Sequence, residues 1–270
     1  MAIVTTDDKH YKAIADVIRR GYVDDIKFRP EDMAGEIDLA LNDKFLQGHM
    51  QGYGEGYDAG QQAEYDRFWD AILQDGNRDD YYYLFSGYGW TAETFKPKYD
   101  IRGWRFQGTF AYTAQLRVSL IDLLDACGVV LDTSKATSVY GMFQYSSITE
   151  IPHIDLSSLT TNASGLFSNC TKLKRIEKIT YTEKSACYAI GSYQECRELE
   201  DVEFAGVIAG DMNLSWSPLL TDATVQSLID HLKDLTGQAV KTLTLHATVG
   251  AKLTDAQKAT ITAKNWQLVY

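Results

Sequence analysis

The sequence predicts an α+β fold, in which a helical N-terminal region precedes a stack of short repeated strands and an α/β C-terminal cap. Three observations support this prediction. Residues 1–75 carry helical spacing of apolar side chains, residues 104–220 contain a loosely repeated unit, and residues 221–270 alternate helix and strand signals. A tyrosine-rich junction, residues 76–103, connects the first two parts.

The N-terminal region is expected to contain two helices. Apolar residues from Tyr11 to Ile18 lie on one helical face, and Gly21 ends that helix. Pro30 stands in the first turn of the second helix, where its missing N–H costs nothing. This second helix is expected to extend to about Gln74.

Four glycines recur at every fourth position of the second predicted helix, namely Gly48, Gly52, Gly56 and Gly60. Each glycine inside a helix costs about 0.5–1 kcal/mol relative to alanine, so a compensating contact is expected. A glycine stripe lets another backbone approach closely, which favours a helix-packing or self-association surface. A flexible connector is the alternative, and the stretch lacks the spacing of a phosphate-binding loop.

The junction contains a cluster of aromatic residues before its Gly-Trp turn. Tyrosine can stack and form hydrogen bonds while losing little rotamer freedom. The candidate recognition residues for a sugar or a protein are Tyr81, Tyr82, Tyr83, Tyr88 and Trp90. Packing of these rings between parts of the chain is the other interpretation, and the favoured one.

The repeated unit is an aromatic residue followed six positions later by leucine and three positions after that by isoleucine or valine. Each Leu-x-x-Ile segment is expected to form a short strand that points its apolar side chains into a stack. A cysteine three positions after the aromatic residue is expected to be buried. The copies are Phe167, Leu173 and Ile176 with Cys170; Tyr193, Leu199 and Val202 with Cys196; a tighter copy with Phe143, Ile148 and Ile151; a candidate first copy with Phe110 and Leu116; and Trp216 as the next aromatic residue.

The last fifty residues carry conventional helix and strand signals. A helix begins at residues 221–222, and Gly237 occupies the place of a left-handed C′ residue. Thr254 and Gln257 have the spacing of a capping box, and the helix they begin is expected to end near Asn265. Two closing strands are expected from alternating apolar residues, Leu243 with Leu245 and Trp266 with Leu268 and Tyr270.

Several segments resemble a known class of protein. LFSNCTKLKRIEKI and YQECRELEDVEF resemble BspA-type leucine-rich repeats. KLTDAQKATITAKNWQLVY is similar to the tail of such proteins encoded by phages and prophages of Gram-positive gut bacteria, and the opening MAIVTTDDKHYKAIADVIR also resembles them. The resemblance implies a short, irregular leucine-rich-repeat solenoid in a non-enzymatic surface or virion protein.

The expected function is that of a phage virion structural protein, a component of the tail, baseplate or head fibre. Its N-terminal helices would attach it, and its repeat domain would be displayed to bind a host-surface glycan or protein. The expected partners are other virion proteins and further copies of the chain, with a trimer favoured. The expected location is the virion, after synthesis in the host cytoplasm and release by lysis. A bacterial leucine-rich-repeat adhesin is the alternative, and a glycan hydrolase is less favoured.

Composition and motifs argue against several other classes. A net charge of −11 and a pI near 4.9 disfavour binding to nucleic acid or an anionic membrane. No apolar run is long enough to span a bilayer, and the N-terminus lacks the pattern of a signal peptide. No nucleophile motif and no metal-ligand spacing is found among the four cysteines and the histidines His10, His49, His153, His231 and His246. No catalytic residue, metal or cofactor is therefore expected.

Overall fold

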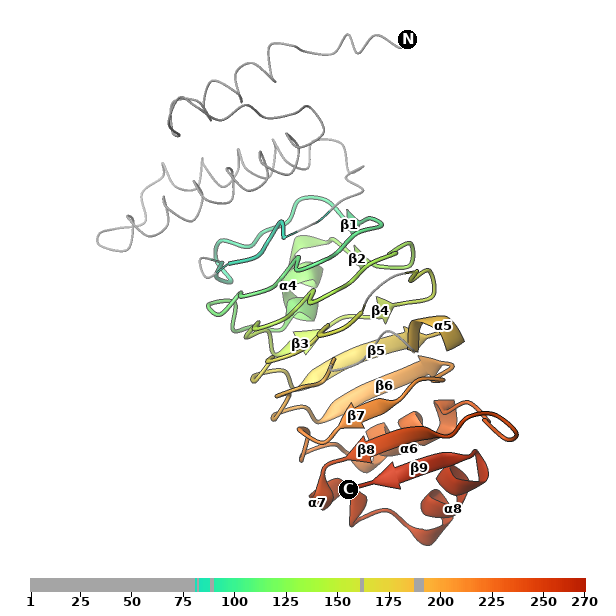
Figure 1. The fold of residues 1–270 in the computed structure, drawn as a ribbon. Coiled ribbons are helices and arrows are strands. Elements are labelled where there is room, and N and C mark those ends of the chain that lie inside the picture. The colour runs from blue at the N-terminus through green and yellow to red at the C-terminus, as the bar shows by residue number, and fades with distance from the viewer. Residues whose placement is uncertain (1–80, 82, 88–89, 161–162, 187–191) are drawn as a thin grey trace, which may run out of the picture. The chain divides into compact units, whose positions relative to one another are not determined.

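Short parallel strands alternate with turns and helices in the computed structural model, which describes residues 81, 83–87, 90–160, 163–186 and 192–270. The chain divides into two compact units, Met1–Gly56 and Tyr57–Tyr270, and the described residues all belong to the second. They form the mixed α+β fold that the sequence predicts (Figure 1). The predicted N-terminal helices and the glycines Gly48, Gly52, Gly56 and Gly60 lie outside the described residues.

The strands are short in the first half of the described chain and longer in the second. The strands are β1 (Ile101–Arg102), β2 (Leu131–Asp132), β3 (Glu150–Ile151), β4 (Ile154–Asp155), β5 (Arg175–Tyr181), β6 (Asp201–Gly206), β7 (Met212–Leu214), β8 (Lys241–Leu245) and β9 (Trp266–Val269). The helices are α4 (Leu120–Cys127), α5 (Glu183–Ala186), α6 (Asp222–His231), α7 (Ala247–Gly250) and α8 (Asp255–Ala263). Among the described residues, no helix combines the length and the hydropathy needed to cross a bilayer.

All pairings between these strands are parallel. Strand β1 pairs with β2, strand β5 pairs with β3, β4 and β6, and β8 lies between β7 and β9. The register places Ile151 beside Ile176 and Ile176 beside Val202. These three residues close the predicted Leu-x-x-Ile segments and lie in strands, whereas Ile148, Leu173 and Leu199 at the start of the segments precede the strands.

Successive turns stack through backbone hydrogen bonds that join equivalent residues. In each turn the N–H of an aromatic residue donates to a carbonyl one turn further along, as in Phe110 to Met142 (2.7 Å), Phe143 to Leu166 (2.9 Å) and Phe167 to Ser192 (3.0 Å). The buried rings of Phe85, Phe110, Phe143, Phe167 and Tyr193 follow one another with centroids 5.3–5.8 Å apart. Phe167 and Leu173 are fully buried, as predicted.

Two details of the predicted repeat need correction. Within the described residues, the ring series extends one turn earlier than Phe110, to Phe85. It does not continue to Trp216, whose side chain is exposed. Buried Leu214 occupies the ring position of that turn. Its carbonyl accepts a hydrogen bond from the N–H of Ser217 that closes the turn. The carbonyl of Tyr193 accepts the corresponding bond from the N–H of Cys196.

A second buried position, which we call the donor row, lies three residues after each ring position. It contains Thr113, Ser146, Cys170, Cys196 and Ser217. The thiols of Cys170 and Cys196 donate to the carbonyl of the ring residue one turn earlier, Phe143 at 2.9 Å and Phe167 at 3.1 Å. Burial raises the pKa of Cys170 and raises that of Cys196 to about 12, so both thiols keep the proton that they donate. These two cysteines are buried as predicted, Cys127 is half-buried, and Cys187 lies outside the described residues.

The C-terminal elements follow their local sequence signals closely. Thr221 caps α6 through a hydrogen bond from the N–H of Thr224. Thr254 and Gln257 exchange both bonds of the predicted capping box, and Asn265 after α8 has a φ of +63°. Gly237 has a φ of +76°, but α6 already ends at His231, so the glycine serves a later turn and the prediction of a C′ residue is wrong.

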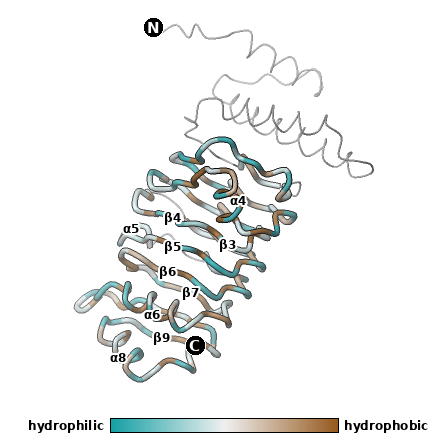
Figure 2. Tube along the Cα trace, turned by 180° about the vertical axis from the view of Figure 1, so that it is seen from behind, coloured by the Kyte–Doolittle hydropathy of each residue, from teal (hydrophilic) through white to brown (hydrophobic). Residues whose placement is uncertain are grey.

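Hydrophobic and hydrophilic positions alternate along the stacked turns (Figure 2). This alternation is expected when each turn buries one side of the chain and exposes the other. Polar residues on the outer side pair between neighbouring turns, as in the ion pairs Lys172–Glu198 (2.5 Å) and Lys178–Glu203 (2.7 Å). Exposed pairs of this kind contribute at most about 1 kcal/mol each, so the buried rings dominate the stability of the stack.

Candidate functional site

The predicted recognition residues of the junction divide into core residues and residues outside the described part. Tyr81 and Trp90 are each 1% exposed. The ring of Tyr81 stacks on Phe106 with centroids 5.2 Å apart, and Trp90 packs edge-on against Phe95 at 5.5 Å. Their burial agrees with the favoured packing interpretation and excludes these two as ligand-contacting residues, since they fill the interior of the first described turns.

Of the other three tyrosines of that prediction, the structure describes Tyr83. Tyr83 is half-buried, and its ring covers Gly108, where an added Cβ would lie 2.4 Å from Tyr83 Cε1. Tyr82 and Tyr88 lie outside the described residues. The structure therefore assigns no exposed aromatic patch to the junction residues it describes.

A different set of side chains, three exposed rings and two half-buried polar residues, lies along one edge of the stacked turns, directly before the donor row. We call it the turn-edge row, and it consists of Tyr112, Tyr145, Asn169, Glu195 and Trp216. Backbone hydrogen bonds place its members in successive turns, from Tyr112 to Gln144 (2.8 Å), Tyr145 to Ser168 (2.9 Å) and Asn169 to Gln194 (2.8 Å). The row thus offers one side chain for each turn.

The backbone of the turn-edge row has an uncommon conformation. Tyr112, Tyr145, Asn169 and Glu195 have φ between +59° and +62°. A left-handed conformation costs an L-residue roughly 1–2 kcal/mol, although asparagine tolerates it better. The bonds from the next turn and the turn-closing bonds beneath hold these residues in place. Strain of this kind, held by the surrounding structure, is common at functional sites.

The side chains of the row form a ring pair at one end and a charged group beside an indole at the other. The rings of Tyr112 and Tyr145 are nearly parallel, 10° apart, with centroids at 5.2 Å and exposed fractions of 37% and 45%. Arg197 donates to Glu195 Oε2 at 2.7 Å, and its guanidinium lies 5.1 Å from the centroid of the Trp216 ring. Trp216 is 38% exposed, and Asn169 lies between the two ends.

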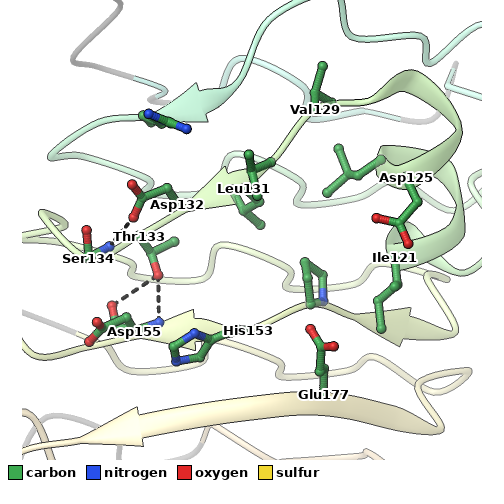
Figure 3. Close-up of a pocket in the computed structure, with 14 residues that line it drawn as sticks. Ile121, Asp125, Val129, Leu131, Asp132, Thr133, Ser134, His153, Asp155 and Glu177 are labelled. Carbon is green, nitrogen blue, oxygen red and sulfur yellow. Dashed lines mark hydrogen bonds between the residues drawn. The ribbon is translucent and has the colours of Figure 1, made fainter.

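A pocket of about 370 Å³ is the second candidate site (Figure 3). It lies beside the longest repeat. In that repeat 33 positions separate Phe110 from Phe143, whereas 24 separate Phe143 from Phe167. The additional residues form α4, which Ser119 caps at its N-terminus and Gly128, with a φ of +66°, ends. The longer turn therefore opens a space between α4 and strands β2, β4 and β5.

The pocket is lined by both apolar and acidic side chains. Ile121 and Asp125 come from α4, Leu131 and Asp132 are neighbours in β2, and Asp155 and Glu177 are the other acids (Figure 3). Thr133 Oγ1 accepts from the N–H of Asp155 at 2.7 Å and donates to its carbonyl at 3.0 Å, which joins β2 to β4 beneath the pocket (Figure 3).

Asp132 is the pocket acid with a shifted pKa. Hydrogen bonds from the side chain and the backbone N–H of Ser134 lower the pKa of Asp132, and the positive charge of Arg102 adds to this effect. Asp132 is thus ionised at neutral pH, where it can accept hydrogen bonds or attract a cation but cannot donate a proton.

The histidines of the described part are separate from one another and each has a polar neighbour. His153 Nε2 lies 2.8 Å from Thr180 Oγ1, His231 Nδ1 lies 2.8 Å from the carbonyl of Ser227, and His246 Nδ1 lies 2.9 Å from Thr248 Oγ1. Within the described residues, no three side chains of His, Cys, Asp or Glu gather in a way that would hold a metal ion. His10 and His49 lie outside these residues.

No family model, no curated protein and no solved structure matches the chain. The candidate sites therefore depend on the geometry of the chain itself. Sequence reasoning missed the turn-edge row, although a signal for it exists. In three of the turns an aromatic residue directly precedes a small hydroxyl residue, as in Tyr112-Thr113, Tyr145-Ser146 and Trp216-Ser217.

Proposed function

We propose that the chain is a structural protein of a phage particle that binds the host surface through the turn-edge row. The observation that carries the binding role is the alignment of exposed rings and half-buried polar groups in successive turns, where Tyr112, Tyr145, Asn169 and Glu195 have a left-handed backbone. A surface fixed before binding loses little conformational entropy when a partner docks, which favours recognition. The placement in a phage particle rests on the sequence resemblance.

The proposed fold behind this function is a short leucine-rich-repeat solenoid with an α/β cap. Parallel pairing of equivalent residues and the series of buried rings from Phe85 to Tyr193 support it. In such a stack each turn buries its face only against its neighbours, so the last turn needs a cover. The segment from α6 to β9 supplies that cover in this proposal, as strand β7 pairs with β8 and β6 contacts α6.

Attachment is assigned to residues 1–75 in this proposal. Their acidic character and the glycine series Gly48, Gly52, Gly56 and Gly60 are the sequence features that support packing against further copies of the chain, a trimer being favoured, or against other virion proteins. The particle, rather than the host cell, would then carry the protein.

A localisation and binding experiment with the full chain tests the proposal. Gold-labelled antibody to the protein should decorate purified phage particles in negative-stain images, and the purified full chain should bind cells of a Gram-positive gut host. Labelling of the bacterial surface instead of particles would favour the adhesin alternative. Absence of binding to every host tested would remove the recognition role.

A further inference from the structure

We infer that the turn-edge row binds a neutral polysaccharide, an inference that rests on the proposed host-surface function and specifies its ligand. The ligand class follows from the order of the side chains in the row. Aromatic rings stand at both ends, and planar polar groups lie between them.

The aromatic ends match the apolar faces of sugar rings. Tyr112 and Tyr145 form one exposed ring pair, and Trp216 supplies an exposed indole at the other end. An aromatic surface buries a large apolar area with few rotatable bonds, so it gains much from contact with the C–H face of a pyranose.

The centre of the row matches sugar hydroxyl groups. Asn169 Nδ2 donates to Ser168 Oγ at 2.9 Å, and the amide has a second N–H and a carbonyl oxygen besides; Glu195 accepts and Arg197 donates. The bond from Arg197 to Glu195, at 2.7 Å, fixes the orientation of both planar groups. Sugar hydroxyls donate and accept, so a single hydroxylated chain can use this whole set.

The charges at the row favour a neutral polysaccharide over an anionic one. Glu195 of the row is paired with the neighbouring Arg197, so this cation is already neutralised and is a poor anchor for a polyanion such as a phosphate-rich cell-wall polymer. A neutral polysaccharide does not need such a cation.

The order of side chains also distinguishes a polysaccharide from a protein partner. Protein interfaces place aromatic anchors in a dry centre and polar groups at the rim. The turn-edge row has the reverse order, because Asn169 and Glu195 lie between its aromatic ends. Because the row extends over successive turns, it fits an extended chain of sugar units better than a single sugar.

The test is affinity electrophoresis of the full chain in gels that contain a neutral cell-wall polysaccharide from Gram-positive gut bacteria. Tyr145→Asn removes one ring, and Asn169 shows that asparagine fits the equivalent left-handed position. We expect the apparent dissociation constant to rise about tenfold, as for loss of an aromatic anchor. Trp216→Ser, at the other end of the row, should give a similar loss.

The matched control is Tyr140→Asn. Tyr140 is 37% exposed, as Tyr112 is, but it lies outside the row, so its variant should bind as the wild type does. Circular dichroism of each variant shows whether it is folded. Equal binding by wild type and both row variants, or equal loss in the Tyr140 control, would overturn the inference.

Treatment of the host cells separates failure of the inference from failure of the proposed function. Periodate oxidation of surface sugars should abolish binding of the full chain, and protease treatment should leave it intact. If binding survives periodate but not protease, the ligand is not a polysaccharide and the inference fails, while the proposed host-surface function remains. Preference for an anionic polymer also overturns it, and no binding to untreated cells or polysaccharide contradicts both proposals.

Discussion

The stacked turns and the C-terminal part of the chain reach a folded structure by different means. In the C-terminal part, α6 has 10 residues, α8 has 9 and β8 has 5, and side chains of Thr221 and Thr254 cap both helices. In the stacked turns, β1, β2, β3 and β4 have 2 residues each. Most of their backbone hydrogen bonds instead close turns or join one turn to the next.

This difference teaches where the stability of each part resides. A capped helix is stabilised by residues close in sequence. A turn of the stack depends on the ring above and the ring below, which lie 24 to 33 positions away in the chain. Changes in the stack should therefore spread to neighbouring turns, whereas changes at a C-terminal cap should remain local.

The largest effect is expected for Phe167→Ala. The Phe167 ring is fully buried between Phe143 and Tyr193, with centroids at 5.8 and 5.6 Å, so its removal opens a cavity that two turns share. We expect the free energy of unfolding, measured by denaturant titration, to fall by roughly 3–5 kcal/mol. Phe167→Leu is the control, and its free energy of unfolding should fall by less. A loss below about 1 kcal/mol for the alanine variant would contradict the ring-based account.

The next effect is expected for Gly206→Ala at the end of β6. Gly206 has a φ of +74°, and an added Cβ would lie 2.0 Å from the carbonyl oxygen of Tyr181 in the neighbouring strand. The loss should be about 2–3 kcal/mol in the same titration. Gly237→Ala in the C-terminal part is the matched control, because its φ is +76° but nothing lies within 4 Å of its added Cβ. If both variants lose the same free energy of unfolding, the close approach of the two strands does not contribute to the effect.

A smaller and local effect is expected for Thr254→Ala. The change removes the hydroxyl that accepts from the N–H of Gln257 at 3.2 Å and so breaks the capping box of α8. We expect a loss of about 1 kcal/mol and faster amide hydrogen exchange within α8. Thr254→Ser should retain the cap. Faster exchange in the stacked turns as well would show that the two parts are more strongly coupled than this comparison implies.

The smallest effect is expected for Asp132→Asn, and it depends on pH. The pKa of Asp132 is lowered from 3.8 in the folded chain, so its charged form stabilises the fold above pH 3.8. That contribution disappears as the pH falls through the lower folded pKa. Wild type should therefore exceed the asparagine variant in stability at pH 7, and the difference should vanish at low pH. If the difference in stability between wild type and the variant grows as the pH falls, the pKa of Asp132 is not lowered in the folded chain.

The sequence predicts the C-terminal part well because its signals are local. The Thr254 and Gln257 pair and the alternation of Leu243 with Leu245 act within a few residues. The stacked turns are predicted only where aromatic and leucine spacing is regular. Trp216 was misplaced because an exposed and a buried aromatic residue look alike in sequence, and only the turn-closing bond to Leu214 distinguishes them.

The candidate sites were less predictable than the core. Tyr81 and Trp90 belong to an aromatic-rich segment, but composition does not show which rings point inward. Tyr112 and Tyr145 are 33 positions apart, so their contact depends on the stacking of turns rather than on any local motif. The pocket depends on a longer connection, and the sequence analysis predicted neither its helix α4 nor the distance of that helix from β4 and β5.

The reactivity of the buried thiols in the donor row can report local opening of the fold. A thiol reacts with an alkylating reagent as the thiolate, and both Cys170 and Cys196 are buried and hold their protons strongly. Their labelling must then wait for the turns to separate, while half-buried Cys127 needs a smaller opening. Mass spectrometry of timed labelling can thus follow the separation of individual turns without any introduced probe.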